Sequence, residues 1–161
     1  MKIFDESGLR FNFSDSANAT RADELNYHGL SAVDFIVETS DEYLFIEVKN
    51  PDSAQSRQYP QRNDFLLDPK EFSLKMSAKF KDSLLKELAM GNKFPKPIVY
   101  ILFLEHRQFD IAQKRLLFER INNHIPKFAE ESFSSVHKIS FMLSDKSHFE
   151  SAYDVFSVVS L

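Results

Sequence analysis

The sequence predicts a single α/β domain in which helices flank a central mixed β-sheet. Segments rich in β-branched and aromatic residues alternate with segments whose apolar residues recur every four positions, a pattern typical of α/β folds. The 161 residues correspond to one domain of ordinary size. A hydrophobic fraction of 43%, with 17 Phe, supplies the apolar surface of a packed core. We therefore expect residues 1–161 to fold as one unit.

The N-terminal part is expected to contain a small hairpin and a helix. Residues 2–4 and 9–13 flank a Glu6-Ser7-Gly8 turn, and this pattern predicts two short paired strands. A helix is expected over about residues 17–28, because Gly29 suits the left-handed cap that ends many helices.

A second hairpin is expected to follow. Residues 31–38 and 43–49 alternate in polarity and are rich in Val, Ile, Phe and Tyr, which favours strands. The polar residues 39–42 between them predict the turn. Residues 50–69 contain three prolines among many polar residues and predict a long loop.

The second half of the chain alternates helices with strands. Residues 71–90 predict a helix that ends at Gly91, because apolar residues recur at steps of four. These apolar residues are Phe72, Met76, Phe80, Leu84 and Leu88. Residues 97–104 predict a strand buried on both faces, because its core is an uninterrupted apolar run.

The remaining elements complete a βα alternation. Asp110 and Gln113 match a capping box that opens a helix running to about residue 125, where Pro126 closes it. Residues 136–143 and 153–159 are expected to be strands. The order helix, strand, strand, helix, strand, helix, strand (αββαβαβ) implies a mixed sheet with helices on both faces.

Composition excludes several functional classes. The chain has no Cys, so a disulfide framework, a Cys-ligated zinc site and a thiol nucleophile are ruled out. The first ten residues carry two acidic residues and lack the apolar core of a signal peptide. The longest apolar run has seven residues, too few to cross a bilayer. We expect a soluble, cytoplasmic protein with no membrane partner.

Charge is distributed unevenly along the chain, although the net charge is only -4. Residues 1–48 carry three Lys or Arg against ten Asp or Glu. Residues 70–96 carry seven against three, and residues 107–127 carry five against two. An acidic first third beside basic helical segments suits carboxylates that hold a cation next to a surface that holds phosphate.

The second hairpin places two carboxylates together. If Glu38 pairs with Tyr43 across the four-residue turn, the register puts Asp34 opposite Glu47. Side chains directly opposed on paired strands lie close enough for both carboxylates to bind one hard cation. Lys49 falls on the same face, whereas Glu38 lies nearer the turn and is expected to be structural.

The same face is not purely polar. Ile36 and Phe45 lie between its charged positions, so a helix is expected to cover them. The opposite face is expected to be apolar and to consist of Val33, Phe35, Val37, Leu44, Ile46 and Val48.

The residues of this hairpin resemble the PD-(D/E)XK, or restriction endonuclease-like, nuclease superfamily. Its pattern is an Asp on one strand, followed on the next strand by Glu or Asp, any residue, and Lys. Asp34 and Glu47-Val48-Lys49 match this pattern, whereas Val33 stands where the name-giving Pro would be. The expected order of elements also agrees with the superfamily fold.

The resemblance implies a metal-dependent deoxyribonuclease. It assigns Asp34, Glu47 and Lys49 as the catalytic centre, with Mg²⁺ or Mn²⁺ bound by Asp34, Glu47 and the carbonyl of Val48. Lys49 would orient or deprotonate the attacking water. Some members add a Glu from the first helix, and Glu24 is the candidate for this role, with a structural role equally open.

The expected helix over residues 71–90 carries a polar stripe. Lys75, Lys79, Asp82 and Lys86 fall within a narrow arc beside the apolar face. Three lysines spaced in this way predict contacts to the phosphate backbone of nucleic acid, with Lys79 as the leading candidate. A solvated basic face is the alternative.

Other functions stay open at this point. An α/β interaction module whose hairpin charges are merely solvated is one alternative. A catalytically silent nuclease-fold protein that binds nucleic acid or a protein partner is the closer alternative. The sequence leaves open DNA against RNA, internal against terminal cleavage, and whether the chain forms a homo-oligomer.

Overall fold

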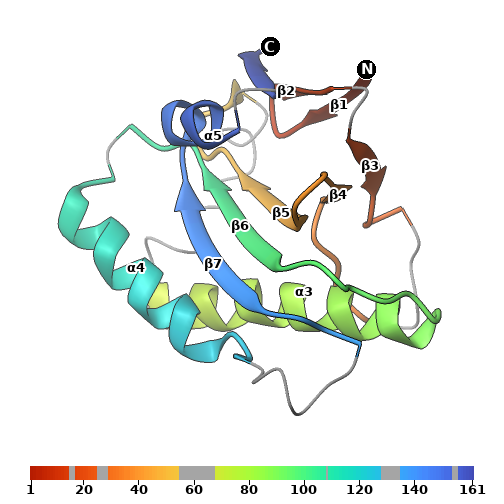
Figure 1. Cartoon of the computed structure of the whole chain (residues 1–161). Helices are drawn as coiled ribbons and strands as arrows, with labels where there is room; N and C mark the ends of the chain where they lie inside the picture. Colours follow the sequence, from red (N-terminus) through yellow and green to blue (C-terminus); the bar gives the residue numbers. More distant parts are fainter. Residues whose placement is uncertain (15–16, 25–28, 55–67, 108, 128–134, 154–155) are drawn as a thin grey trace.

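The computed structural model describes residues 1–14, 17–24, 29–54, 68–107, 109–127, 135–153 and 156–161 (Figure 1). Two β-sheets and three helices make up these residues. The helices are α3 (Pro69–Ala89), α4 (Ile111–His124) and α5 (Lys146–Ala152). The expected α/β class is confirmed.

The larger sheet is mixed and has five strands in the order β3-β4-β5-β6-β7. Its strands are β3 (Asn18–Arg21), β4 (Phe35–Glu38), β5 (Tyr43–Lys49), β6 (Ile98–Leu104) and β7 (Ile139–Ser144). The first three pair antiparallel, and β6 and β7 continue parallel to β5. All seven residues of β6 are buried, because it lies inside the sheet and is covered on both faces, as its apolar run predicts.

The smaller sheet is antiparallel and brings the first and last strands together. Its order is β1-β2-β8, with β1 (Lys2–Glu6), β2 (Leu9–Phe13) and β8 (Ser157–Ser160). The N-terminal hairpin is confirmed. Its turn uses two left-handed residues, Ser7 at φ 51° and Gly8 at φ 76°, and the glycine adopts this conformation without steric cost.

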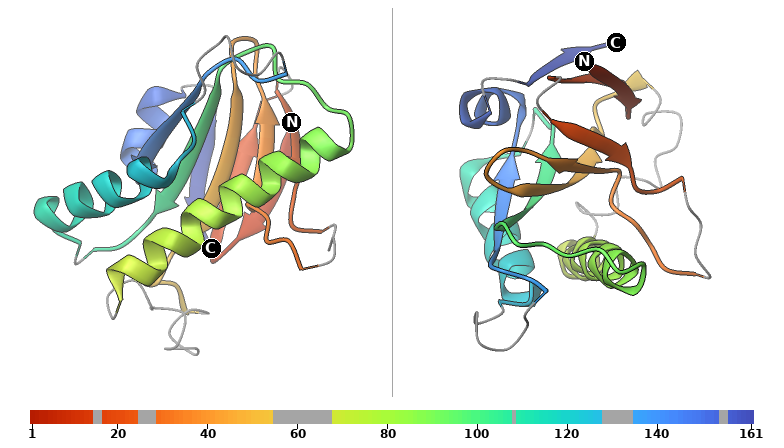
Figure 2. Two further views of the ribbon diagram at one scale, coloured as in Figure 1. Left: turned by 90° about the horizontal axis from the view of Figure 1, so that it is seen from below. Right: turned by 45° about the vertical axis from the view of Figure 1, so that its right-hand side comes forward.

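The elements form three layers, with the larger sheet in the middle (Figure 2). Helices α3 and α4 cover one face, where Phe45, Phe80 and Tyr100 belong to one buried apolar cluster. The smaller sheet and α5 cover the other face, where Phe11 and Phe103 belong to a second cluster. The site-bearing hairpin β4-β5 is therefore held between two cores.

Helix α3 has the boundaries that its sequence signals specify. Asp68 accepts hydrogen bonds from the first-turn N–H groups of Lys70 and Glu71, and Pro69 occupies the first turn, where its missing N–H costs nothing. The residues spaced by four from Phe72 to Leu84 are buried, and Gly91 follows the helix at φ 86°. The capping box of Asp110 and Gln113 likewise opens α4 as predicted.

The helix expected over residues 17–28 is wrong. Residues Asn18–Arg21 form the edge strand β3, which pairs antiparallel with Phe35–Glu38 of β4. Ala19 is buried in the core between the sheets, and the long-range pairing outweighs local helix propensity. Glu24 accordingly follows a strand and lies on no helix, and residues 25–28 lie outside the described residues.

Three other boundaries differ from expectation. β7 begins at Ile139, and Val136 makes an isolated bridge to Phe94 instead. Residues 146–152 form the short helix α5, capped by Asp145, which the sequence analysis did not predict. The last strand was expected over residues 153–159, and β8 begins at Ser157. Residues 154–155 lie outside the described residues. Residues 55–67 of the expected loop also lie outside them.

Val33 is the exception to the predicted two-faced hairpin. It packs in the cluster of Phe45 and Phe80, because the chain leaves the β4-β5 ladder just before Phe35.

Over the described residues, no helix is long and apolar enough to cross a membrane.

Phe80 should be a principal stabilising residue, because its ring contacts Phe45 at 5.5 Å and Tyr100 at 4.9 Å between centroids. We expect Phe80→Ala to lower the free energy of unfolding by about 3 to 5 kcal/mol. Leu85, on the same helix, is 57% exposed, and Leu85→Ala should change it by less than about 1 kcal/mol. Urea denaturation followed by circular dichroism measures both, and equal losses would contradict the packing described here.

Candidate active site

The predicted hairpin register is confirmed for the paired residues of β4 and β5, and Asp34 lies just outside this pairing. The pairs Phe35↔Ile46 through Glu38↔Tyr43 follow the expected alignment. Asp34 lies one residue before β4, and its backbone N–H donates to the carbonyl of Ile46 at 3.0 Å. Its carboxylate oxygen Oδ2, in place of a backbone carbonyl, accepts a hydrogen bond from the backbone N–H of Val48 at 2.6 Å. Asp34 is thus fixed against the β5 residue that follows Glu47.

Glu47 is the most deeply buried charged group described in the structure, with an exposed fraction of 0%. Its Oε1 accepts hydrogen bonds from two ammonium groups, that of Lys49 on β5 and that of Lys79 on α3, the latter at 2.7 Å. Its Oε2 is buried and has no hydrogen-bond partner among the described residues. Buried carboxylate oxygens normally have hydrogen-bond partners, so Oε2 is an acceptor that the described side chains leave unused.

The buried carboxylates shift the ionisation of the site. Burial, reinforced by repulsion from Glu47, raises the pKa of Asp34 to about 7, against the opposing pull of Lys49, Lys79 and the Val48 N–H. Burial alone would lower the pKa of Lys49, but attraction to Glu47 and Asp34 outweighs it and raises that pKa. The metal-free site therefore keeps its ammonium charge and binds a proton at Asp34 near neutrality.

Two of the three lysines in the polar stripe of α3 point towards the protein interior. Lys79 contacts Glu47 inside the site, and Lys86 is buried, with its ammonium donating to the carbonyl of Ala22 at 2.9 Å. Burial removes Lys86 from the predicted phosphate contacts. Lys75 is exposed and pairs with Glu71 one turn away. Of the three predicted lysines, only Lys79 and Lys75 present an ammonium at the surface.

The rest of this stripe anchors the segment that leads into Asp34. Asp82 accepts hydrogen bonds from the backbone N–H and the hydroxyl of Ser31, at 3.0 and 2.7 Å. The hydroxyl of Ser83 accepts from the backbone N–H of Val33 at 2.9 Å. The position of Asp34 relative to Glu47 therefore depends on α3 as well as on the hairpin.

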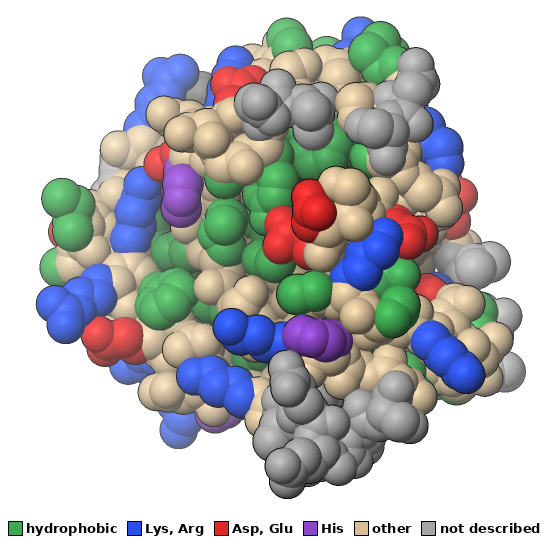
Figure 3. Space-filling model, in the orientation of Figure 1, with side chains coloured by type: hydrophobic (Ala, Val, Ile, Leu, Met, Phe, Trp, Pro, Cys, Tyr) green, Lys and Arg blue, Asp and Glu red, His purple; other side chains and the backbone are tan. Residues whose placement is uncertain are grey.

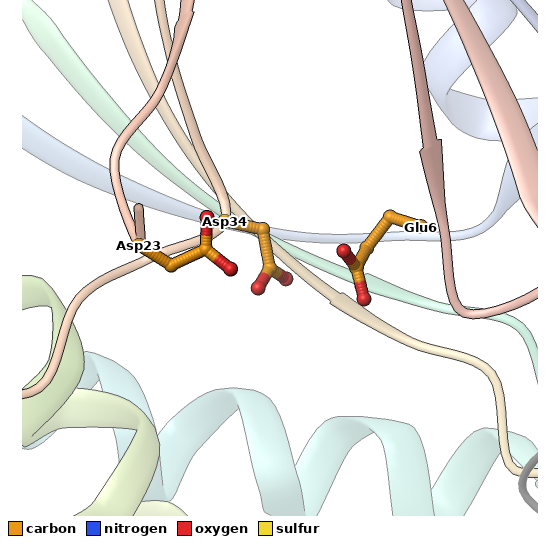
Figure 4. Close-up of side chains that lie close together, drawn as sticks. All are labelled: Glu6, Asp23 and Asp34. Atoms are coloured by element: carbon orange, nitrogen blue, oxygen red, sulfur yellow. The ribbon is translucent and has the colours of Figure 1, made fainter. Parts of the chain in front are cut away.

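Two further carboxylates approach Asp34 from outside the hairpin. Glu6 ends β1 and Asp23 follows β3, and one carboxylate oxygen of each lies within 4.8 Å of one of Asp34 (Figure 4). In Figure 4, Asp34 lies between the other two. Arg21 partly neutralises this cluster, since its guanidinium lies 3.1 Å from Glu6 and 3.8 Å from Asp23.

Neither Glu6 nor Asp23 was predicted from the sequence, which pointed to Glu24 instead. The Glu24 side chain is 71% exposed and lies 3.9 Å from Arg21, and it does not belong to the cluster around Asp34. With the expected helix absent, the neighbouring Asp23 takes the position beside Asp34. The excess of acidic residues in the first third of the sequence was the only signal that could have pointed to Glu6 and Asp23.

A second basic region lies on α4, away from this site. Figure 3 shows Lys and Arg side chains spread over the α4 side of the molecule, with apolar and acidic side chains between them. Lys114 pairs with Asp145 at 3.1 Å, and Arg115 pairs with Glu119 at 3.0 Å. These pairs neutralise part of the positive charge that the sequence places in residues 107–127.

Comparison with known proteins identifies no relative. No protein-family model, no curated protein and no solved structure matches this chain.

The Asp34 carboxyl makes stability depend on pH. Its pKa of about 7 in the folded state lies above the usual 3.8, so folding binds a proton and stability is lost as the pH rises from about 4 to about 7. In EDTA we expect the melting temperature of the wild type to fall between pH 5 and pH 8. The melting temperature of Asp34→Asn should fall less over the same range. At pH 8 the variant should be as stable as wild type or up to about 1 kcal/mol more stable.

Asp41→Asn, in the exposed hairpin turn, is the control and should retain the wild-type pH dependence. An Asp34→Asn variant that melts below wild type at pH 8 would show that Asp34 is a structural hydrogen-bonding residue.

Proposed function

We propose that this protein is a Mg²⁺- or Mn²⁺-dependent nuclease that hydrolyses phosphodiester bonds, with DNA as the favoured substrate. The observation that carries the proposal is the fully buried Glu47, which holds two ammonium groups on one oxygen, has no partner at the other, and is near enough to raise the pKa of Asp34. The match of Asp34 and Glu47-Val48-Lys49 to the superfamily motif supports the same reaction.

The residues present fit a hard divalent cation. Asp34 and Glu47 offer carboxylate oxygens, the open Glu47 Oε2 among them, and the carbonyl of Val48 is adjacent. Glu6 and Asp23 are nearer to Asp34 than Glu24 and are the better candidates for additional ligands. A bound cation would neutralise charge on the reacting phosphate and lower the pKa of a coordinated water.

The protein side chains supply the remaining steps. Lys49 lies on Glu47 and keeps its proton, so its ammonium is placed to orient the attacking water and to stabilise the negative charge that develops on the phosphate. Asp34 must release its proton before it can bind a cation, and cation binding therefore competes with protonation below about pH 7. The site opens to solvent beside Lys49 and Lys79, whose side chains are 29% and 27% exposed.

A catalytically silent protein that binds nucleic acid or a protein partner is the second candidate. One observation favours it: Arg21, Lys49 and Lys79 together balance the charges of the three carboxylates that they contact, Glu6, Asp23 and Glu47. Cation binding and cleavage separate the two candidates.

The cation site is tested by thermal stability. We expect Ca²⁺ or Mn²⁺ to stabilise the wild type by about 2 to 3 kcal/mol at roughly 100-fold excess over its Kd, because only the folded state binds. Asp34→Ala should abolish this stabilisation, and Glu24→Ala, at the exposed neighbouring site, should retain it. A wild type that melts at the same temperature in Mn²⁺ and in EDTA would rule out the metal site.

The catalytic role of Lys49 is tested by cleavage. We expect Lys49→Ala to reduce Mg²⁺-dependent cleavage of plasmid DNA by at least about 100-fold, because it removes a charge that stabilises the reacting phosphate. The variant should keep the Mn²⁺-dependent rise in melting temperature, since the carboxylate ligands remain. Lys93→Ala, at an exposed position after α3, is the lysine control and should cleave like wild type. Undiminished cleavage by Lys49→Ala would contradict the assignment.

A further inference from the structure

Lys79 occupies an unusual electrostatic position in the candidate site. It shares Oε1 of Glu47 with Lys49, so two positive charges meet at one oxygen of one carboxylate. One ammonium is enough to neutralise that carboxylate, and the two cations repel each other across it. The arrangement therefore holds more positive charge than Glu47 requires.

The two lysines differ in their other partners. Lys49 also donates to the carbonyl of Val48 at 3.3 Å and is attracted by Asp34 and Glu6. Among the described residues, the Lys79 ammonium has no hydrogen-bond or ion-pair partner except Glu47. A cation bound at Asp34 and at Oε2 of Glu47 would neutralise the charge that holds both ammonium groups. Lys49 would keep the Val48 carbonyl and the attraction of Glu6, whereas Lys79 has no further hydrogen-bond or ion-pair partner among the described residues.

An ammonium that is 27% exposed and has lost its counter-ion requires a new anion or fuller hydration. The backbone of Lys79 cannot retreat, because Asp82 and Ser83 fasten the next turn of α3 to the segment before Asp34. Its four-carbon side chain can still swing the charged end away from Glu47. The ammonium thus stays within reach of whatever occupies the mouth of the site.

We propose that Lys79 is a substrate-binding residue that exchanges Glu47 for a phosphate oxygen of the nucleic acid when a divalent cation occupies the site. This inference rests on the proposed nuclease function. It makes cation and substrate binding mutually reinforcing, because each ligand takes one partner of the Glu47–Lys79 ion pair. Lys79 then acts at the reacting phosphate and not as one of a row of backbone contacts.

The exchange differs measurably from a simple surface contact. A lysine that merely touches the phosphate backbone contributes to DNA affinity whether or not a cation is present. Lys79 is engaged with Glu47 until a cation arrives, so its contribution should appear only with the cation. Removing its charge should also make the empty site more negative and strengthen cation binding.

The test measures affinity for a short fluorescein-labelled DNA duplex by anisotropy, in EDTA and in Ca²⁺. We expect Lys79→Met to bind the duplex about tenfold more weakly than wild type in Ca²⁺ and equally well in EDTA. Without DNA, Ca²⁺ should bind the variant roughly three- to tenfold more tightly, as measured by Ca²⁺-dependent melting. Lys75→Met, one helical turn away and exposed, is the control and should match wild type in the Ca²⁺ titration.

The outcomes separate this inference from the proposed function. A wild type with no Ca²⁺-dependent DNA binding overturns both. A wild type that binds in Ca²⁺, with Lys79→Met either unchanged or weakened equally in EDTA, overturns only the exchange role of Lys79. If circular dichroism shows that Lys79→Met does not fold, the same measurements on Lys79→Gln test the exchange role of Lys79. Glutamine can still donate a hydrogen bond to Glu47, so it removes the charge and keeps this contact.

Discussion

The burial of one carboxylate, that of Glu47, constrains the rest of this site. A charge taken out of water is tolerated only when nearby groups compensate it. Lys49 follows it on the same strand, and Lys79 reaches it from the helix packed over that strand. Strand β5, helix α3 and the site are therefore held in one arrangement, and none of the three can shift without exposing an unpaired charge inside the protein.

Helix α3 has two roles, on adjoining faces. Its apolar face covers the sheet through Phe72, Met76 and Phe80, and this packing supplies stability. The polar residues beside that face hold the chain before Asp34 and supply Lys79 to Glu47. A stripe of charged residues next to an apolar helix face predicts a solvated surface when the helix covers an entirely apolar sheet face. Here the covered face of the sheet contains the buried Glu47, and Lys79 of the stripe reaches it.

Sequence alone was sufficient where local signals agree with the tertiary structure. The turn at residues 39–42, with alternating residues on both sides, determines the hairpin register, and cap residues determine α3 and α4. It failed at β3, because four residues at a sheet edge, Asn18–Arg21, carry no periodicity that distinguishes them from a helix start. Glu6 lies near Asp34 because a separate small sheet packs beside the hairpin, and Asp23 lies near it because β3 pairs with β4. No residue spacing in the sequence reports either contact.

The charge balance of the site sets a condition on any ligand. Glu6, Asp23, Asp34 and Glu47 face Arg21, Lys49 and Lys79, so the groups cancel when Asp34 keeps its proton. A divalent cation that binds here must displace that proton, and the site then carries one positive charge in excess. An anion is the natural complement of this excess. The charged side chains that stabilise the metal-free protein thus disfavour binding of a cation alone and favour binding of a cation together with a phosphate. Cation binding and substrate binding are therefore coupled electrostatically.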